Sequence, residues 1–183
     1  MALKNIGVIV GSLRKAAFSR RIAKALTEIA PATLAPDLIE IGDLPFYNQD
    51  LETDDPPAAW RAFRDRVRPL HGLLFVTPEY NRSMPAVLKN AIDVGSRPPG
   101  KSVWSGKPAA VISTSPGPIG GFGANHHLRQ SLVALGVATM PREAYLGGVD
   151  KLFESEEALV PATREFLSKY LHAFAEWVER NPA

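Results

Sequence analysis

The sequence predicts an α/β domain in which a doubly wound, five-stranded parallel sheet carries helices on both faces. Apolar runs of strand length alternate along the chain with stretches whose apolar residues recur at helical spacing. The runs are almost continuously apolar, as in strands that are buried on both sides. The length of 183 residues suits one domain, so we expect a single domain over residues 1–183.

The expected strands are short apolar runs that end at turn-forming residues. The first run ends at Gly11-Ser12, and the third ends at Thr77-Pro78. The five strands are expected at residues 4–10, 38–41, 72–76, 109–112 and within 137–146.

The expected helices begin and end at residues that favour helix boundaries. The first is stopped by Pro31, and the third is entered at Pro85, a favourable residue in a first turn. The last carries aromatic residues near one stripe, which makes it amphipathic. The five helices are expected at residues 19–30, 57–69, 84–94, 124–135 and 155–179, with an irregular loop at 42–56.

Five alternating strands in a chain of this length suit a flavodoxin-like strand order. Ligands of such sheets bind beyond the carboxyl ends of the strands, at the point where the strand order reverses. We therefore expect the functional residues in the loops at 11–20, 77–84 and 113–124, which follow the first, third and fourth strands.

Composition excludes several classes of function. The chain has no cysteine, which excludes disulfides, iron–sulfur clusters and Cys-ligated zinc, so any redox chemistry needs a bound organic cofactor. The net charge of +2 is small and no segment clusters Lys and Arg, which argues against a nucleic-acid partner. No apolar stretch approaches the roughly 20 residues that span a bilayer, and the N-terminus lacks the shape of a signal peptide. We expect no membrane partner and a cytoplasmic location.

The first loop combines hydroxyls and cations with the start of a helix. Exposed N–H groups and the helix dipole favour an anion there, which predicts a terminal phosphate. The candidate residues are Ser12, Arg14, Ser19 and Arg20. The loop lacks the glycine spacing of a dinucleotide site, so a mononucleotide is expected. The alternative is that Ser19 only caps the helix while the arginines are solvated.

The second and third loops have the features that surround a flat heteroaromatic ring. In the second, Pro78 favours a turn, Asn81 offers an amide donor and acceptor, and Tyr80 is an aromatic with a polar tip. The alternative is an ordinary turn before a helix capped by Ser83. In the third, glycines let the backbone approach a ligand and leave N–H groups free, the alternative being a flexible connection.

Two further patterns suggest other chemistry but lack the required context. Residues 95–102 match the P-loop expression GxxxxGK[ST], yet a helix precedes them and a strand follows, the reverse of a P-loop. Pro98 and Pro99 also lack the N–H donors of a phosphate cradle. His126 and His127 are adjacent on a helix and diverge by about 100°, so no metal site is expected.

Taken together, the loops resemble those of the NADPH-dependent FMN reductase family, which includes bacterial quinone, azo-dye and chromate reductases. The resemblance covers most of the chain, to at least Gly147-Gly148. The residues that carry it are Gly11-Ser12-Leu13-Arg14 with Ser19, Pro78-Glu79-Tyr80-Asn81, Leu88-Lys89-Asn90-Ala91-Ile92-Asp93, and Gly120-Gly121 with His127-Leu128-Arg129-Gln130.

The resemblance implies FMN as the cofactor and NAD(P)H as the co-substrate. By resemblance, the FMN phosphate would be held by Ser12, Arg14, Ser19 and Arg20. The isoalloxazine ring would be lined by Pro78, Glu79, Tyr80 and Asn81, with Ser115 and Gly117 near its other edge. Members of the family typically form homodimers or homotetramers whose subunits meet beside the flavin.

Three positions depart from the family pattern. Arg20 stands where many relatives have Asn, which bears on the phosphate contact. Gly123 and His126 replace an Arg and a Tyr of the quinone and chromate reductase branch, which bears on tetramer contacts and substrate preference.

The expected activity is NAD(P)H-dependent reduction of small acceptors, namely quinones, azo compounds, metal oxyanions or free flavin. The hypothesis is a ping-pong exchange in which NAD(P)H delivers a hydride to flavin N5 and an acceptor then takes the electrons, with no catalytic side chain and no metal. One alternative is a flavodoxin-type electron carrier without direct NAD(P)H oxidation, although such carriers tend to be acidic. A second is a regulatory domain, but no acidic cluster of a phospho-acceptor follows the strands.

Overall fold

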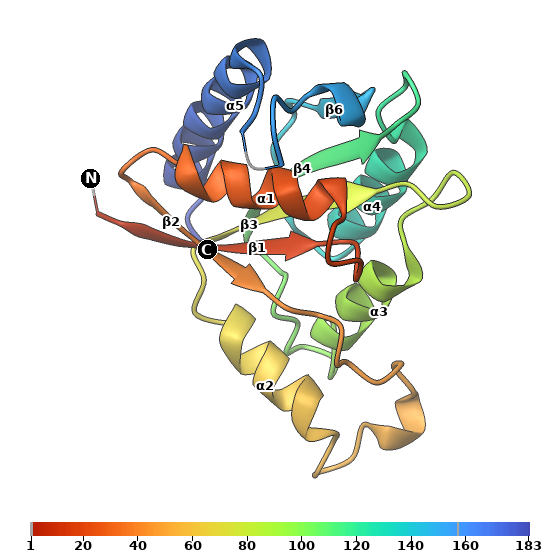
Figure 1. The fold of residues 1–183 in the computed structure, drawn as a ribbon. Helices are drawn as coiled ribbons and strands as arrows, with labels where there is room; N and C mark the ends of the chain where they lie inside the picture. Colours follow the sequence, from red (N-terminus) through yellow and green to blue (C-terminus); the bar gives the residue numbers. More distant parts are fainter. Residues whose placement is uncertain (1, 157) are drawn as a thin grey trace.

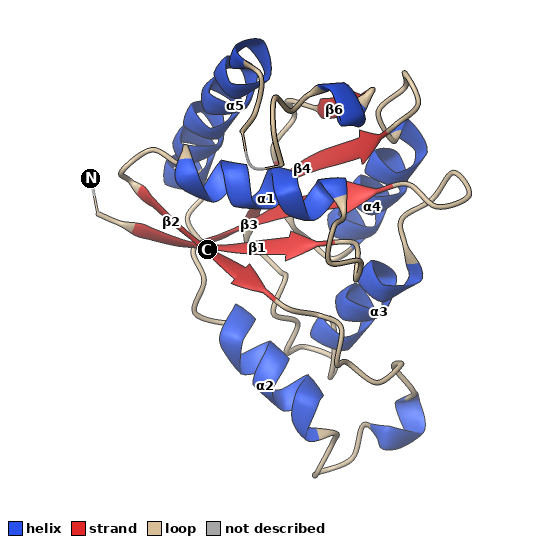
Figure 2. Ribbon diagram, viewed as in Figure 1, coloured by secondary structure: helices blue, strands red, loops and turns tan. Residues whose placement is uncertain are grey.

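A parallel sheet forms the centre of the molecule (Figures 1 and 2). The computed structural model describes residues 2–156 and 158–183. In this part of the chain the strands are β1 (Lys4–Val10), β2 (Leu34–Ile39), β3 (Gly72–Pro78), β4 (Pro108–Ser115), β5 (Ala138–Thr139) and β6 (Ala144–Gly147). Their order is β2-β1-β3-β4-β5, with β6 also paired to β4, and every pairing is parallel. The predicted doubly wound α/β fold is confirmed.

Helices cover both faces of the sheet, as predicted. The helices are α1 (Phe18–Glu28), α2 (Ala58–Val67), α3 (Ala86–Gly95), α4 (Phe122–Ala134) and α5 (Pro161–Arg180), with single 3₁₀ turns η1 (Gln49–Leu51) and η2 (Val149–Lys151). Buried residues of α1 and α5, such as Ile22 and Phe174, share one apolar core with one side of the sheet. Buried residues of α2, α3 and α4 form a second core on the other side, around Trp60, Leu88 and Leu128.

The expected fifth strand consists of two short strands. Pro141 lies between β5 and β6, and proline has no N–H to donate to a neighbouring strand. β5 pairs with the start of β4, and β6 pairs with its end. Between the two strands, the Arg129 guanidinium donates hydrogen bonds to the carbonyl oxygens of Met140, at 2.8 Å, and Arg142, at 3.1 Å.

Two elements begin four or more residues away from their expected start. The second strand begins at Leu34 rather than at residue 38, because β2 pairs only with β1 and an edge strand tolerates Pro36. The last helix begins at Pro161 rather than at residue 155. Before it, Phe153 and Leu159 form an antiparallel bridge, and proline then suits the first helical turn of α5.

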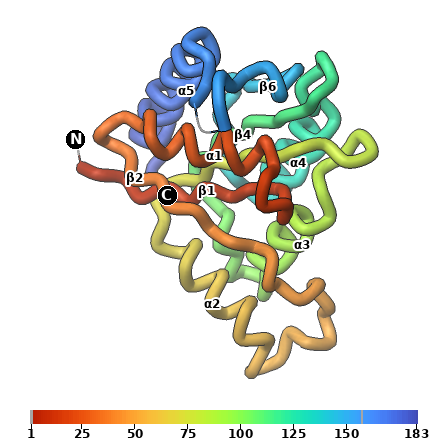
Figure 3. Tube along the Cα trace, viewed as in Figure 1, coloured from red at the N-terminus to blue at the C-terminus, as the bar shows by residue number. Residues whose placement is uncertain are grey.

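The segment that matches a P-loop has no P-loop geometry. It starts at Gly95, the last residue of α3, and the chain then continues through Trp104 into β4. An NTPase site therefore finds no support in the fold. The loop at 42–56 extends beside α2, away from the sheet, where the tube in Figure 3 shows it in orange. Among residues 2–156 and 158–183, no helix combines the length and the apolar character needed to cross a bilayer.

Candidate functional site

The three loops singled out in the sequence follow β1, β3 and β4, which are neighbours in the sheet. Because the strands are parallel, their carboxyl ends meet at one edge (Figure 1). The first loop is in direct contact with the end of β3, since the Gly11 N–H donates to the Val76 carbonyl oxygen at 2.9 Å. A Cβ on Gly11 would lie 2.4 Å from Thr77 Oγ1, so this close approach requires glycine.

Helix α1 begins in the first loop without a side-chain cap. Its N-cap residue is Ala17, and its first turn holds no acidic residue. Ser19 lies inside the first turn, and its Oγ is buried without a hydrogen-bond partner in the described part of the chain. The alternative in which Ser19 caps the helix is therefore wrong. A buried hydroxyl with no partner, at the positive end of a helix dipole, is suited to an anion.

Ser12 and Arg14 complete this first loop. Ser12 is buried, and its Oγ accepts a hydrogen bond of 3.3 Å from the Arg14 N–H. The Arg14 side chain is exposed. These groups and Ser19 provide hydroxyls, a cation and helix N–H groups within one short segment, which are the donors that a phosphate ester accepts.

Arg20 is already paired. Its guanidinium donates two hydrogen bonds to the Glu40 carboxylate, at 2.7 and 2.9 Å. This bidentate pair lowers the pKa of Glu40, chiefly through the hydrogen bond from Arg20. Because Glu40 offsets the Arg20 charge, Arg20 contributes less to binding an anion than the sequence suggested. Its phosphate contact stays a prediction.

The second loop is a tight turn built on two left-handed residues. Asn81 has φ of 50° and Arg82 has φ of 65°, values that asparagine tolerates better than most residues. Tyr80 and Ser83 flank them and exchange two backbone hydrogen bonds of 2.9 Å each. Ser83 does not cap α3, whose N-cap is Pro85 without a side-chain bond, so the cap in that alternative is wrong. The turn leaves Tyr80 half exposed at the carboxyl end of β3.

Glu79 ties this second loop to α4. Its Oε2 accepts a hydrogen bond of 3.1 Å from the Ala124 N–H in the first turn of α4. Gly121 is the N-cap of that helix and has no side chain to serve this purpose. The Glu79 side chain is 12% exposed and pairs with Arg82 at 3.4 Å. A carboxylate in this position satisfies an N–H of the first turn and complements the helix dipole.

In the third loop, backbone approaches backbone closely. The Ser115 Oγ accepts a hydrogen bond of 3.0 Å from the Gly117 N–H, and the Gly117 carbonyl accepts one of 3.2 Å from Gly148. Gly120 and Gly121 follow with φ of 60° and 76°. Both candidate residues of this loop, Ser115 and Gly117, thus lie at the carboxyl end of β4, next to the second loop.

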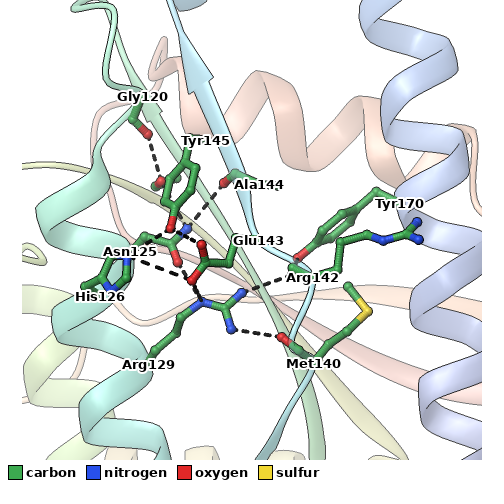
Figure 4. Close-up of polar contacts among 11 residues, drawn as sticks. Gly120, Asn125, His126, Arg129, Met140, Arg142, Glu143, Ala144, Tyr145 and Tyr170 are labelled. Atoms are coloured by element: carbon green, nitrogen blue, oxygen red, sulfur yellow. Dashed lines mark hydrogen bonds and ion pairs between the residues drawn. The ribbon is translucent and has the colours of Figure 1, made fainter.

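A polar network behind the third loop was not foreseen from the sequence (Figure 4). Asn125 and Arg129 lie one helical turn apart on α4, and the Arg129 Nε donates to Asn125 Oδ1 at 2.8 Å. An Asn and an Arg four positions apart on a predicted helix, directly after a glycine-rich loop, would have indicated this network from the sequence. At its exposed end, Tyr145 donates to Glu143 at 2.6 Å. Burial, and then this bond, raise the pKa of Tyr145 to about 12.

The adjacent histidines have separate partners. His126 Nε2 lies 2.9 Å from the Tyr145 hydroxyl, and His127 Nδ1 lies 2.9 Å from Ser83 Oγ. Within residues 2–156 and 158–183, no group of three or more His, Asp or Glu side chains could hold a metal ion.

A doubly wound sheet, an uncapped helix start with a buried free hydroxyl, and two turn-built loops at the same edge define a flavodoxin-like protein. The model of the NADPH-dependent FMN reductase family matches residues 4–150, and the chain belongs to this family.

Individual relatives agree with this assignment. A quinone reductase of Pseudomonas putida strain KT2440 is 57% identical over 180 residues, which cover 98% of this chain and 97% of that protein. A 2-hydroxy-1,4-benzoquinone reductase of a Burkholderia species is 46% identical, with 97% of each chain covered. Among solved structures, the flavoenzyme FerB, an NAD(P)H:(acceptor) oxidoreductase of Paracoccus denitrificans, has a TM-score of 0.92 at 39% identity and covers 99% of this chain and 100% of its own.

These findings confirm the predicted enzyme class. The chain is an oxidoreductase with FMN as its cofactor and NAD(P)H as its co-substrate. The buried, unpartnered Ser19 hydroxyl fits this cofactor, because FMN carries a phosphate that can accept its hydrogen bond.

Proposed function

We propose that this enzyme reduces quinones and other small oxidants with electrons from NAD(P)H, and that the two substrates bind in turn in a ping-pong exchange. The observation that carries the proposal is the unpartnered Ser19 hydroxyl at the start of α1, at the sheet edge where the three loops meet. The quinone substrates in the names of two relatives support the choice of acceptor.

Each loop has a distinct part in holding FMN. Ser12, Arg14 and Ser19, with the N–H groups at the start of α1, would bind the phosphate. Arg20 would assist through its charge, reduced by Glu40. The ring would lie against Pro78, Glu79, Tyr80 and Asn81, with Ser115 and Gly117 at its other edge. FMN, when bound, supplies the two-electron chemistry that side chains lack.

Exposed apolar side chains near these loops suit flat substrates. Tyr80 is 50% exposed, and Phe122 and Ile119 in the third loop region are 51% and 48% exposed. Exposed apolar patches often mark ligand-binding and partner-binding surfaces. The nicotinamide ring and a quinone are both flat and largely apolar, so one open face can receive each of them in turn.

The first experiment is spectroscopic. The purified protein is mixed with FMN, its visible spectrum is recorded, and NAD(P)H is added without oxygen. We expect the flavin band to bleach and then to return when a quinone is added. Parallel initial-rate lines, with both substrates varied, would support binding in turn, whereas intersecting lines would contradict the ping-pong order.

The same experiment distinguishes a reductase from the alternative, a flavodoxin-type electron carrier. Such a carrier would bind FMN but would not be reduced by NAD(P)H directly. Absence of FMN binding at micromolar concentration would contradict the site assignment itself.

We also propose that the chain forms a homodimer or homotetramer and that it is cytoplasmic. The exposed aromatic side chains beside the loops, Tyr80 and Phe122, support contact with a second copy. A cytoplasmic location agrees with the need for a recycled pool of NAD(P)H. Light scattering of the purified protein and cell fractionation test these two proposals separately.

A further inference from the structure

A buried chain of hydrogen bonds runs from α4 to the third loop (Figure 4). The Asn125 Nδ2 donates to Ser113 Oγ at 3.1 Å, and Ser113 Oγ donates to the Gly120 carbonyl oxygen at 2.7 Å. Asn125 and Ser113 are both completely buried. Ser113 lies in β4 and Asn125 lies in α4, and neither was among the residues expected to contact the cofactor.

The direction of this chain is determined by Arg129. A guanidinium can only donate, so the Asn125 oxygen must face Arg129, and the Asn125 nitrogen must face Ser113. The same nitrogen also donates to the Ala144 carbonyl at 3.3 Å. A hydroxyl has a single proton. Because Ser113 already accepts from Asn125, its proton is directed to Gly120.

The group at the end of the chain is a peptide with no side chains to orient it. Gly120 and Gly121 both have positive φ, and a Cβ on Gly120 would lie 2.7 Å from the Tyr145 carbonyl carbon. A trans peptide is planar, with its C=O and N–H on opposite sides. When Ser113 holds the Gly120 carbonyl, the Gly121 N–H therefore points away from Ser113. No described residue accepts a hydrogen bond from this N–H.

We propose that Asn125 and Ser113 are positioning residues that orient the Gly120–Gly121 peptide, so that the Gly121 N–H donates to the ring of bound FMN. The inference rests on the proposed function, which brings FMN to this loop. An N–H directed in advance at a ring that gains negative charge on reduction stabilises the reduced form more than the oxidised form. Asn125 and Ser113 thereby raise the reduction potential of the bound flavin without touching it.

The test compares Ser113→Ala with Ser96→Ala. Ser96 also donates a 2.7 Å hydrogen bond to a backbone carbonyl, that of Asp93, but it lies at the far end of α3. Dissociation constants for oxidised and reduced FMN, and the midpoint potential, are measured for each variant. For Ser113→Ala we expect reduced FMN to bind about 10-fold less tightly relative to oxidised FMN, a fall of about 30 mV for a two-electron couple. Ser96→Ala should match the wild type.

A second variant, Asn125→Asp, keeps the shape of the side chain. The introduced carboxylate still accepts from Arg129 but cannot donate to Ser113, so the Ser113 proton turns away from Gly120. We expect the reduction potential of the bound flavin to fall, as for Ser113→Ala. Arg129 compensates the negative charge of the introduced carboxylate. Thermal unfolding of each apoprotein shows whether the variant is folded.

The outcomes separate this inference from the proposed function. If the wild type does not bind FMN, the proposed function fails. If the wild type binds FMN and both variants lose thermal stability but keep the wild-type ratio of reduced to oxidised affinity, the residues are only structural and the inference is overturned. A lower potential in both variants, with Ser96→Ala unchanged, supports it.

Discussion

The carbonyl oxygen of Arg82 lies so close to Gly123 that a Cβ at position 123 would be only 2.4 Å from it. The turn after β3 thus rests directly on the first turn of α4. Glu79 stabilises the same contact, because its carboxylate accepts a hydrogen bond from the Ala124 N–H. A side chain at position 123 would therefore push these two segments apart.

Substituting Gly123→Ala tests this packing. The added methyl would meet backbone rather than a flexible side chain, so the second loop must move, at a cost of about 1–3 kcal/mol in the free energy of unfolding. Thermal or urea unfolding of the apoprotein measures this loss of stability. The matched control is Gly42→Ala, whose Cβ would contact only the exposed Leu13 side chain, at 3.1 Å. Equal stability of the two variants would contradict the close contact.

Substituting Ser19→Ala tests the phosphate site. Hydrogen bonds to charged groups contribute about 1.5–3 kcal/mol, so FMN should bind roughly 10- to 100-fold less tightly. Riboflavin lacks the phosphate, and its affinity should not change. Fluorescence titration with both flavins makes the comparison.

Thr139→Ala is the matched control for Ser19→Ala. Thr139 is in β5 and, like Ser19, has a buried hydroxyl without a partner among the described residues. We expect it to leave both flavin affinities unchanged. A parallel loss of FMN and riboflavin binding in Ser19→Ala would show a general defect and not a phosphate contact.

Substituting Glu52→Ala tests how the long loop at 42–56 is held. Arg64 donates to both Glu52 oxygens, at 2.9 and 2.7 Å, and to the Val94 carbonyl, with its side chain only 6% exposed. Removing the carboxylate leaves a buried cation unpaired, which costs about 3–5 kcal/mol.

Glu176→Ala is the control for Glu52→Ala, because the ion pair of Glu176 with Arg180 is largely exposed. An exposed pair contributes about 0–1 kcal/mol. Urea unfolding should therefore separate the two variants clearly. Similar midpoints would mean that Arg64 finds another partner when Glu52 is removed.

The pKa of Tyr145 gives a prediction for alkaline pH. Burial and the Glu143 carboxylate raise this pKa to about 12, above the value near 10 of an unfolded chain. The protonated phenol is thus favoured in the folded state. Its contribution to stability is complete below pH 10 and is lost as the pH rises through about 12. Tyrosinate absorbance of the wild type minus that of Tyr145→Phe should titrate near pH 12, and a midpoint near 10 would contradict the prediction.

Several features could be predicted because they depend on neighbouring residues in the chain. The apolar run before Gly11 and the one before Pro78 each indicate a strand and the loop that follows it. Once parallel strands are recognised, the rule that their carboxyl ends share an edge brings these loops together. For this reason the candidate loops could be chosen without coordinates.

The errors have a different origin. β2 was placed too late because Pro36 is acceptable only on an edge strand, and edge position depends on the whole sheet. The ion pair of Arg20 was missed because its partner Glu40 is 20 residues away in the chain. Likewise, nothing near Ser113 in the chain shows that Asn125 donates to it.

Local sequence therefore established the order of strands and helices, the loops that we propose hold FMN and, through their motifs, the enzyme family. Packing of distant segments established which polar groups in those loops are free and which are already satisfied. The reason is physical. Periodicity and turn chemistry act between residues a few positions apart, whereas a buried hydrogen bond joins whichever donor and acceptor the fold brings within about 3 Å. The free hydroxyl of Ser19 and the paired guanidinium of Arg20 are adjacent in the chain, and only their tertiary contacts distinguish them.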